Sequence, residues 1–236
     1  MKETPTTPNV PPQDPTVSAK ASNQPPPSPR SHSFSSSEAL KFGFDIFKKN
    51  IVTFIKIAAV LLIINIVMGA IGSLFGHNNP LVLIWGIISY LIAFVIQIGI
   101  VKMILDLYDG KPLNFSNLYT QYALGLRYYA ASIIYGIMVL VGLICLIVPG
   151  IYLAIRFQFF SFLIVDKNAG IAESLSKSSA LTEGVKINLF LFALLIVVIN
   201  IIGFLLLGIG LLVTIPTTMM ATIHVYRKLL SQTPGI

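Results

Sequence analysis

Arg156 is the one charged residue well inside a long apolar stretch, and its side chain is suited to binding an anion. A guanidinium near the centre of a bilayer costs about 2.5–3.5 kcal/mol on insertion scales, so its position requires a reason. The side chain could snorkel outward to a lipid phosphate or an anionic substrate. Alternatively, it could pair with carbonyls freed near Pro149, or with Asn65 or Asn200 across a helix bundle. Arg156 is therefore the candidate lipid or anion contact.

Asn65 and Asn200 are the other polar residues expected near mid-depth in the membrane. Amide side chains hydrogen-bond between membrane helices, and each such bond contributes roughly 0.6–2 kcal/mol. An ion site would need more oxygen ligands than these two positions supply. We therefore predict that both residues make interhelical polar contacts.

The residue types of an active site do not gather in this chain. No Asp or Glu lies within a predicted span, where it could serve as a general acid, a base or a proton relay. The histidines, His32, His77 and His224, are too far apart in the predicted topology to form a metal site. The single cysteine, Cys145, lies in an apolar run, which excludes a disulfide framework and a thiolate metal site. We predict a non-enzymatic protein with no catalytic residues, metal or cofactor.

The composition indicates a membrane environment. Hydrophobic residues make up 55% of the chain and charged residues 11%, against about 25% charged residues in an ordinary soluble domain. A soluble fold of this length could not bury so much apolar surface, whereas lipid removes the need to bury it. The formal charge of +7 is not concentrated in a basic stripe with interleaved aromatic residues, as nucleic-acid binding would require. Membrane lipids, and not nucleic acid, are the expected partners.

Six apolar stretches predict an all-α, polytopic integral membrane protein with six transmembrane helices in three hairpins. Most of them approach or exceed the roughly 20 residues that cross about 30 Å of hydrocarbon. The fourth covers only about 22 Å at about 1.5 Å per residue, and Pro216 is expected to interrupt the sixth. The predicted spans are residues 51–76, 81–105, 128–148, 151–165, 187–207 and 211–229.

The basic residues lie in alternate connections between the predicted spans. Three connections contain no Lys or Arg: residues 77–80, 149–150 and 208–210. By the positive-inside rule, these turns face outward, and the multi-pass chain has both its N- and C-termini on the cytoplasmic side of the cell membrane. Four residues near the cytoplasmic ends of the spans are expected to snorkel: Lys56, Lys102, His224 and Arg227.

Two inner segments, residues 36–49 and 170–184, have the pattern of amphipathic helices. We predict that they lie in the inner interface with their apolar faces toward the bilayer and their lysines near anionic headgroups. An offset of 135 residues aligns the surroundings of Glu38 with those of Glu173. This similarity suggests a repeated unit, an interfacial helix followed by a transmembrane hairpin, with a shorter middle copy.

The N-terminal segment differs from the rest of the chain. Residues 1–37 are rich in proline, serine and threonine and contain almost nothing that could be buried, so we predict a disordered cytoplasmic tail. Residues 38–230 form the predicted six-span membrane domain. Residues 231–236 form a short C-terminal tail.

Two neighbouring stretches carry a recognisable pattern. VPGIYLAIRFQFFSFLIVD at residues 148–166 and ESLSKSSALTEG at residues 173–184 contain P-G-I-x-L, an arginine in the next helix, and L-x-x-S-x-x-L-T-x-G. They resemble a bacterial and archaeal family that includes the membrane domain beside some glycerophosphoryl diester phosphodiesterases and related six-span proteins of unknown function. The matching positions include Pro149, Gly150, Ile151, Leu153, Arg156, Leu175, Ser178, Leu181, Thr182 and Gly184.

The resemblance implies the membrane portion alone, over about residues 38–230. Six residues follow Leu230, and the segment before residue 38 has no pattern of a catalytic barrel, so no phosphodiesterase activity is expected. The leading hypothesis is a non-catalytic integral membrane module that contacts lipids or a membrane or cytoplasmic protein partner. The alternative is a small transporter or channel for an anionic or amphiphilic solute.

Overall fold

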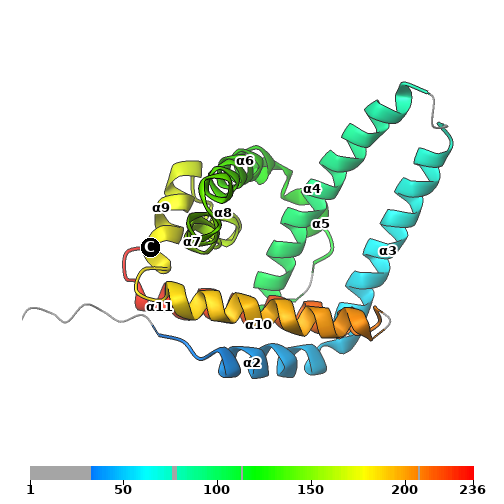
Figure 1. Cartoon of the computed structure of the whole chain (residues 1–236). Helices are drawn as coiled ribbons and strands as arrows, with labels where there is room; N and C mark the ends of the chain where they lie inside the picture. The colour runs from blue at the N-terminus through cyan, green and yellow to red at the C-terminus, as the bar shows by residue number, and fades with distance from the viewer. Residues whose placement is uncertain (1–32, 76–78, 113, 207) are drawn as a thin grey trace, which may run out of the picture. The chain divides into compact units, whose positions relative to one another are not determined.

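The computed structural model describes residues 33–75, 79–112, 114–206 and 208–236. Regular secondary structure in these residues is entirely helical (Figure 1). The helices are α2 (Ser36–Lys49), α3 (Ile51–Ser73), α4 (Leu81–Tyr108), α5 (Asn117–Thr120), α6 (Tyr122–Cys145), α7 (Ile147–Phe157), α8 (Phe160–Lys167), α9 (Ile171–Leu181), α10 (Lys186–Leu205) and α11 (Leu211–Gln232).

Five described segments are long and apolar enough to cross a membrane: α3, α4, α6, α7 together with α8, and α10. Only 6–28% of the most apolar stretch of each segment is buried, so most of these apolar side chains need lipid or another protein around them. The prediction of an all-α protein is therefore confirmed for the described residues, and several of its helices are long and apolar enough to span a membrane. The predicted sixth span falls on α11, which is not one of the five.

Helix α11 continues through Pro216, so the predicted interruption is wrong. A proline inside a helix removes one backbone donor, which in α11 is the donor to the Leu212 carbonyl. Here the Thr217 hydroxyl donates to the Val213 carbonyl at 2.7 Å, and the Thr218 hydroxyl donates to the Thr214 carbonyl at 2.8 Å. The threonines around Pro216 thus make local side-chain bonds and lower the apolar character of α11.

The turn between α6 and α7 lies at Leu146, and not at Pro149 and Gly150 as predicted. Both residues belong to the first turn of α7, where the missing amide of a proline has no helical partner to lose. Gly150 lies against Gly142, where an added Cβ atom would come within 2.8 Å of the Gly150 Cα atom. The two glycines thus allow α6 and α7 to turn back closely on each other.

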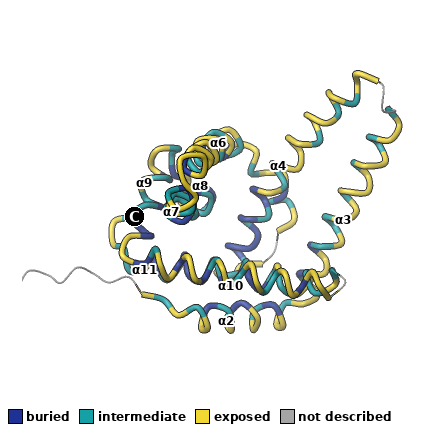
Figure 2. The backbone as a smooth tube through the Cα atoms, viewed as in Figure 1, coloured by how far each residue is buried: buried dark blue, intermediate teal, exposed yellow. Residues whose placement is uncertain are grey.

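The buried core lies at the inner ends of the long helices, meaning the ends next to the Lys- and Arg-bearing connections. It gathers these ends of α3, α4, α6, α10 and α11 with α2, α8 and α9. Figure 2 shows α4 changing from exposed at its start to buried at its end. Away from the core, the α3–α4 pair diverges from the α10–α11 pair (Figure 1), and side chains such as Leu62 and Leu83 are 61% and 74% exposed.

Helix α2 packs along α11 through Ala39, Gly43 and Phe47, which are all buried. The predicted helix at residues 36–49 has the same bounds in the structure, since Ser35 caps its start by accepting from the Glu38 amide at 3.4 Å. Its buried face contacts protein, so the prediction that this face lies toward the bilayer is wrong. Ala and Gly at the contact let the two backbones approach closely.

Both predicted tail boundaries fall inside ordered structure. Residues 1–32 of the predicted tail lie outside the described residues, whereas α2 already begins at Ser36. The Ser33 amide donates to Gln232 at 2.9 Å, and the Gln232 amide donates back to the Ser33 carbonyl at 2.9 Å. The described helices therefore extend past both predicted boundaries, from Ser36 in α2 to Gln232 in α11.

Two stretches of the described chain share one order of helices. A short helix precedes two long ones in α2–α3–α4 and in α9–α10–α11. In the middle, α5 has four residues and precedes α6 and α7. Glu38 and Glu173 occupy the first turns of α2 and α9, where a carboxylate favours the helix start.

Candidate functional site

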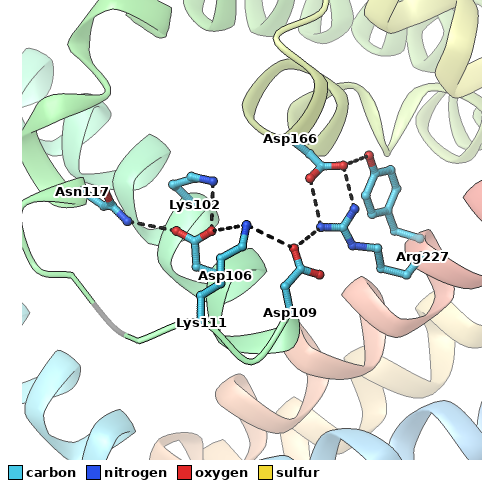
Figure 3. Close-up of polar contacts among 8 residues, drawn as sticks. Lys102, Asp106, Asp109, Lys111, Asn117, Asp166 and Arg227 are labelled. Carbon is cyan, nitrogen blue, oxygen red and sulfur yellow. Dashed lines mark hydrogen bonds and ion pairs between the residues drawn. The ribbon is translucent and has the colours of Figure 1, made fainter.

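Two polar clusters lie beside the core, and the first joins α8 to α11. The guanidinium of Arg227 donates to both oxygens of Asp166, at 2.8 and 2.9 Å (Figure 3). The buried Tyr226 hydroxyl donates to the same carboxylate at 3.0 Å. The side chains of Asp166 and Arg227 are only 13% and 19% exposed, so this bidentate ion pair is largely shielded from solvent.

The cluster continues into α4. Arg227 also donates to Asp109 at 2.8 Å, and Lys111 bridges Asp109 and Asp106 at 3.9 and 3.5 Å. Asp106 is 7% exposed and accepts from Lys102 at 2.9 Å and from Asn117, the first residue of α5, at 3.1 Å. We call the set in Figure 3 the ionic clamp; it consists of Lys102, Asp106, Asp109, Lys111, Asn117, Asp166, Tyr226 and Arg227.

The ionic clamp contains three cations and three carboxylates, so it carries no net charge to attract a further ion. Its arrangement suits a structural connection between α4, α8 and α11. The expectation that Lys102 and Arg227 snorkel is wrong, because both side chains are held by carboxylates. The sequence does contain one indication of this cluster, since Asp106 and Asp166 directly follow predicted spans. A carboxylate that is partly buried at such a place is stable only with a cationic partner.

The second cluster surrounds Arg156 at the break between α7 and α8. The Arg156 Nε atom donates to the Ser179 hydroxyl at 2.7 Å. The Arg156 carbonyl accepts from the hydroxyls of Ser178 and Thr182, each at 3.2 Å, and Ser178 also accepts from the Phe159 amide at 3.1 Å. Residues at the end of α9 thereby supply hydrogen-bond partners for backbone groups at the break between α7 and α8.

Replacement of Ser178 with alanine is expected to lower the free energy of unfolding by about 1–2 kcal/mol. The serine is fully buried, and its loss leaves the Phe159 amide without an acceptor. Thermal unfolding in detergent measures the effect. The exposed Ser176→Ala on the same helix is the control, with a change below about 0.5 kcal/mol. Equal effects of the two substitutions would contradict the assigned role of Ser178.

Lys186, at the start of α10, completes the second cluster. Its ammonium donates to the Tyr152 hydroxyl of α7 at 3.0 Å and lies 4.8 Å from the centre of the Tyr152 ring. Arg156 lies four residues after Tyr152 and therefore on the same face of α7. Gly184, with φ of +80°, makes the turn that leads into α10, a conformation that glycine adopts without strain. We call Tyr152, Arg156, Ser179 and Lys186 the cationic site.

The structure does not bring Asn65 or Asn200 to Arg156. The Asn65 amide donates to the Leu61 carbonyl of its own helix at 2.8 Å, so this bond is not the predicted interhelical contact. The Asn200 amide does reach across from α10 to the Thr218 hydroxyl of α11, at 3.4 Å. The predicted partners of Arg156 are replaced by Ser179, because α9 folds back against the end of α7.

The predicted family-motif residues lie around the cationic site and support it. Pro149 and Gly150 start α7, at whose other end Arg156 lies. Leu175 packs against the core, and Ser178 and Gly184 have the roles described above. Arg156 is the tenth residue of α7, which places it about 15 Å from the Leu146 turn at about 1.5 Å per residue.

A third contact joins α2 to the inner end of α11. Lys228 donates to Glu38 at 2.8 Å and holds the pKa of that exposed carboxyl below its ordinary value of 4.5. The ring of His224 stacks on Phe42 with centres 4.4 Å apart, and its Nδ1 atom lies 3.3 Å from the Tyr108 hydroxyl. His224 is thus packed between helices, and the expectation that it snorkels is wrong.

A pocket of about 360 Å³ lies between α3, α4 and α11. Its walls are formed by residues such as Ile57, Ile104 and Met219, with Gln97 as the side chain that carries a polar amide. Such a lining suits an apolar occupant. Within the described residues, no group of three or more His, Cys, Asp or Glu side chains is placed to hold a metal ion, and His32 and His77 lie outside them.

Comparison with known proteins finds relatives without assigned activities. No protein-family model matches the chain, and no solved structure matches it significantly. The chain is 31% identical over 134 residues to the uncharacterized protein Rv2560 of Mycobacterium tuberculosis. It is also 31% identical over 134 residues to the uncharacterized protein Mb2590 of Mycobacterium bovis. The matches cover 56% of this chain and 40% of each relative, so the chain spans less than half of their length.

Proposed function

We propose that this protein is a non-catalytic integral membrane module that contacts lipids or partner proteins. The observation that carries this proposal is the exposure of apolar side chains along five helices whose inner ends share one core. The large polar cluster at that core is neutral and internally paired, which suits a structural role. A module of this kind acts through its lipid-facing surface.

The proposed location is the cell membrane, with the core and both termini on the cytoplasmic side. The Lys- and Arg-bearing connections support this orientation by the positive-inside rule. The sixth crossing would be α11, paired with α10 as the third hairpin.

We also propose kinship with the membrane domain that accompanies some glycerophosphoryl diester phosphodiesterases. The motif residues Ser178 and Thr182 both donate a hydrogen bond to the carbonyl of Arg156, which is another motif residue. These contacts explain why the three residue types would occur together in one motif. The kinship would concern the membrane portion only.

A small transporter for an anionic or amphiphilic solute is the second candidate. The break between α7 and α8 beside Arg156 favours it, since discontinuous helices surround the substrate sites of many transporters. Asn65 and Asn200, which a shared polar path would require, have partners elsewhere. The first candidate therefore ranks higher.

Native mass spectrometry and a flux assay separate these candidates. The module is expected to retain phospholipid through mild detergent extraction and to show no anion flux above protein-free liposomes. The flux assay uses liposomes of phosphatidylethanolamine and phosphatidylglycerol with an anionic fluorescent dye inside. Saturable flux that Arg156→Gln abolishes without unfolding the protein would replace the first candidate with the transporter.

A further inference from the structure

The cationic site differs from the ionic clamp in its charge balance. Each cation of the ionic clamp has a carboxylate within 4 Å, whereas neither Arg156 nor Lys186 forms an ion pair within the described part of the chain. Their recorded partners are hydroxyl groups, those of Ser179 and Tyr152. Arg156 and Lys186 thus place two cations with neutral hydrogen-bond partners at the junction of α7, α9 and α10.

The surroundings of the cationic site are apolar and exposed. On α7, Val148 is 76% exposed and lies one turn before Tyr152. On α10, a stripe of exposed residues begins one turn after Lys186, on the same side of the helix, and runs toward the other end: Phe190, Leu194, Val197 and Ile201. This spacing of four, three and four residues places them on one helix face. A charged site that opens onto an apolar strip matches a molecule with an anionic head and a hydrocarbon chain.

We propose that the cationic site binds the phosphate group of an anionic phospholipid, with an acyl chain along the exposed stripe of α10. This inference rests on the proposed lipid-contacting function and names its ligand. An arginine fork and a lysine ammonium together suit a phosphate, which offers several acceptor oxygens, and the Tyr152 hydroxyl can add a further hydrogen bond. Ser179 orients the guanidinium through Nε, and Gly184 allows the turn that delivers Lys186.

The test measures lipid binding to the full chain in detergent by native mass spectrometry. Three probes are compared: dioleoyl phosphatidylglycerol, dioleoylglycerol with the same chains but no phosphate, and inorganic phosphate. Lys186→Gln is the main variant, because Lys186 has an exposed contact with Tyr152 and its loss leaves the α7–α9 bonds intact. Lys56→Gln removes an equal charge from an exposed position on α3 and is the matched control.

Wild-type protein is expected to bind phosphatidylglycerol in preference to dioleoylglycerol. Lys186→Gln should weaken phosphatidylglycerol binding about fivefold, as expected for loss of one cation near an anionic lipid. Lys186→Arg should bind as wild type, and Lys56→Gln should change binding less than twofold. Inorganic phosphate at millimolar concentration should not displace the lipid.

Three results would overturn the proposal. Equal binding by Lys186→Gln and wild type, or an equal loss in Lys56→Gln, would remove the cationic site as the specific contact. Displacement of the lipid by inorganic phosphate at the same residues would assign the site to a soluble anion. Failure of wild-type protein to retain any of the lipids would instead contradict the lipid-contacting function itself.

Discussion

Replacement of Asp166 with alanine is expected to lower the free energy of unfolding by about 3 kcal/mol. The substitution leaves the guanidinium of Arg227, which is 19% exposed, with Asp109 as its remaining carboxylate. It also takes the acceptor from the Tyr226 hydroxyl, whose residue is fully buried. Reversible unfolding in mixed detergent micelles measures the loss.

Lys177→Gln is the matched control for the Asp166 prediction. It breaks the 2.8 Å pair between Lys177 and Glu173 on α9, whose side chains are 26% and 51% exposed. Exposed pairs of this kind contribute below about 0.5 kcal/mol. If Asp166→Ala had no larger effect than Lys177→Gln, the ionic clamp would not be what connects α8 to α11.

Replacement of Gly43 with alanine is expected to destabilise the protein by about 2 kcal/mol. A Cβ atom at residue 43 would collide with the Thr217 carbonyl oxygen and would lie 2.9 Å from the Ala221 amide nitrogen. Both are backbone atoms inside α11 and cannot turn away, so α2 must shift and lose packing at Ala39 and Phe47. Unfolding in micelles and faster hydrogen exchange of the α2 amides would report this shift.

Gly136→Ala separates this collision from the general effect of removing a helical glycine. Gly136 lies on α6, and an added Cβ atom there would meet nothing within 4 Å. Alanine is favoured over glycine in a helix by about 0.5–1 kcal/mol, so this control should be neutral or stabilising. Destabilisation by both substitutions to the same extent would mean that the close approach of α2 to α11 is not what Gly43 provides.

The sequence predicted the parts of the fold that local pattern determines. The bounds of α2 follow from its cap at Ser35 and its spaced apolar residues, and the long apolar runs predict the membrane-spanning helices. The turn at Leu146 was missed because the rule that proline and glycine mark turns also fits Pro149 and Gly150, which instead begin α7.

The polar clusters depend on residues far apart in the chain. Arg227 meets Asp166 and Asp109 from 61 and 118 positions away, and sequence order alone does not pair them. Arg156 was recognised from its cost in lipid, but its contact with Ser179 requires α9 to fold back. Lys186 was used only as one of the basic residues that indicate a cytoplasmic connection. Its contact with Tyr152 arises because the start of α10 lies against α7.

The central claim is that several helices cross a membrane from a shared core on the cytoplasmic side. Thiol labelling tests it directly, with the native cysteine removed by Cys145→Ser and one cysteine introduced at a time. An impermeant reagent applied to intact cells is expected to label Asn79→Cys, beside the α3–α4 turn, and to label Ser176→Cys on α9 only after permeabilisation. Labelling of Ser176→Cys in intact cells, with Asn79→Cys unlabelled, would contradict the account.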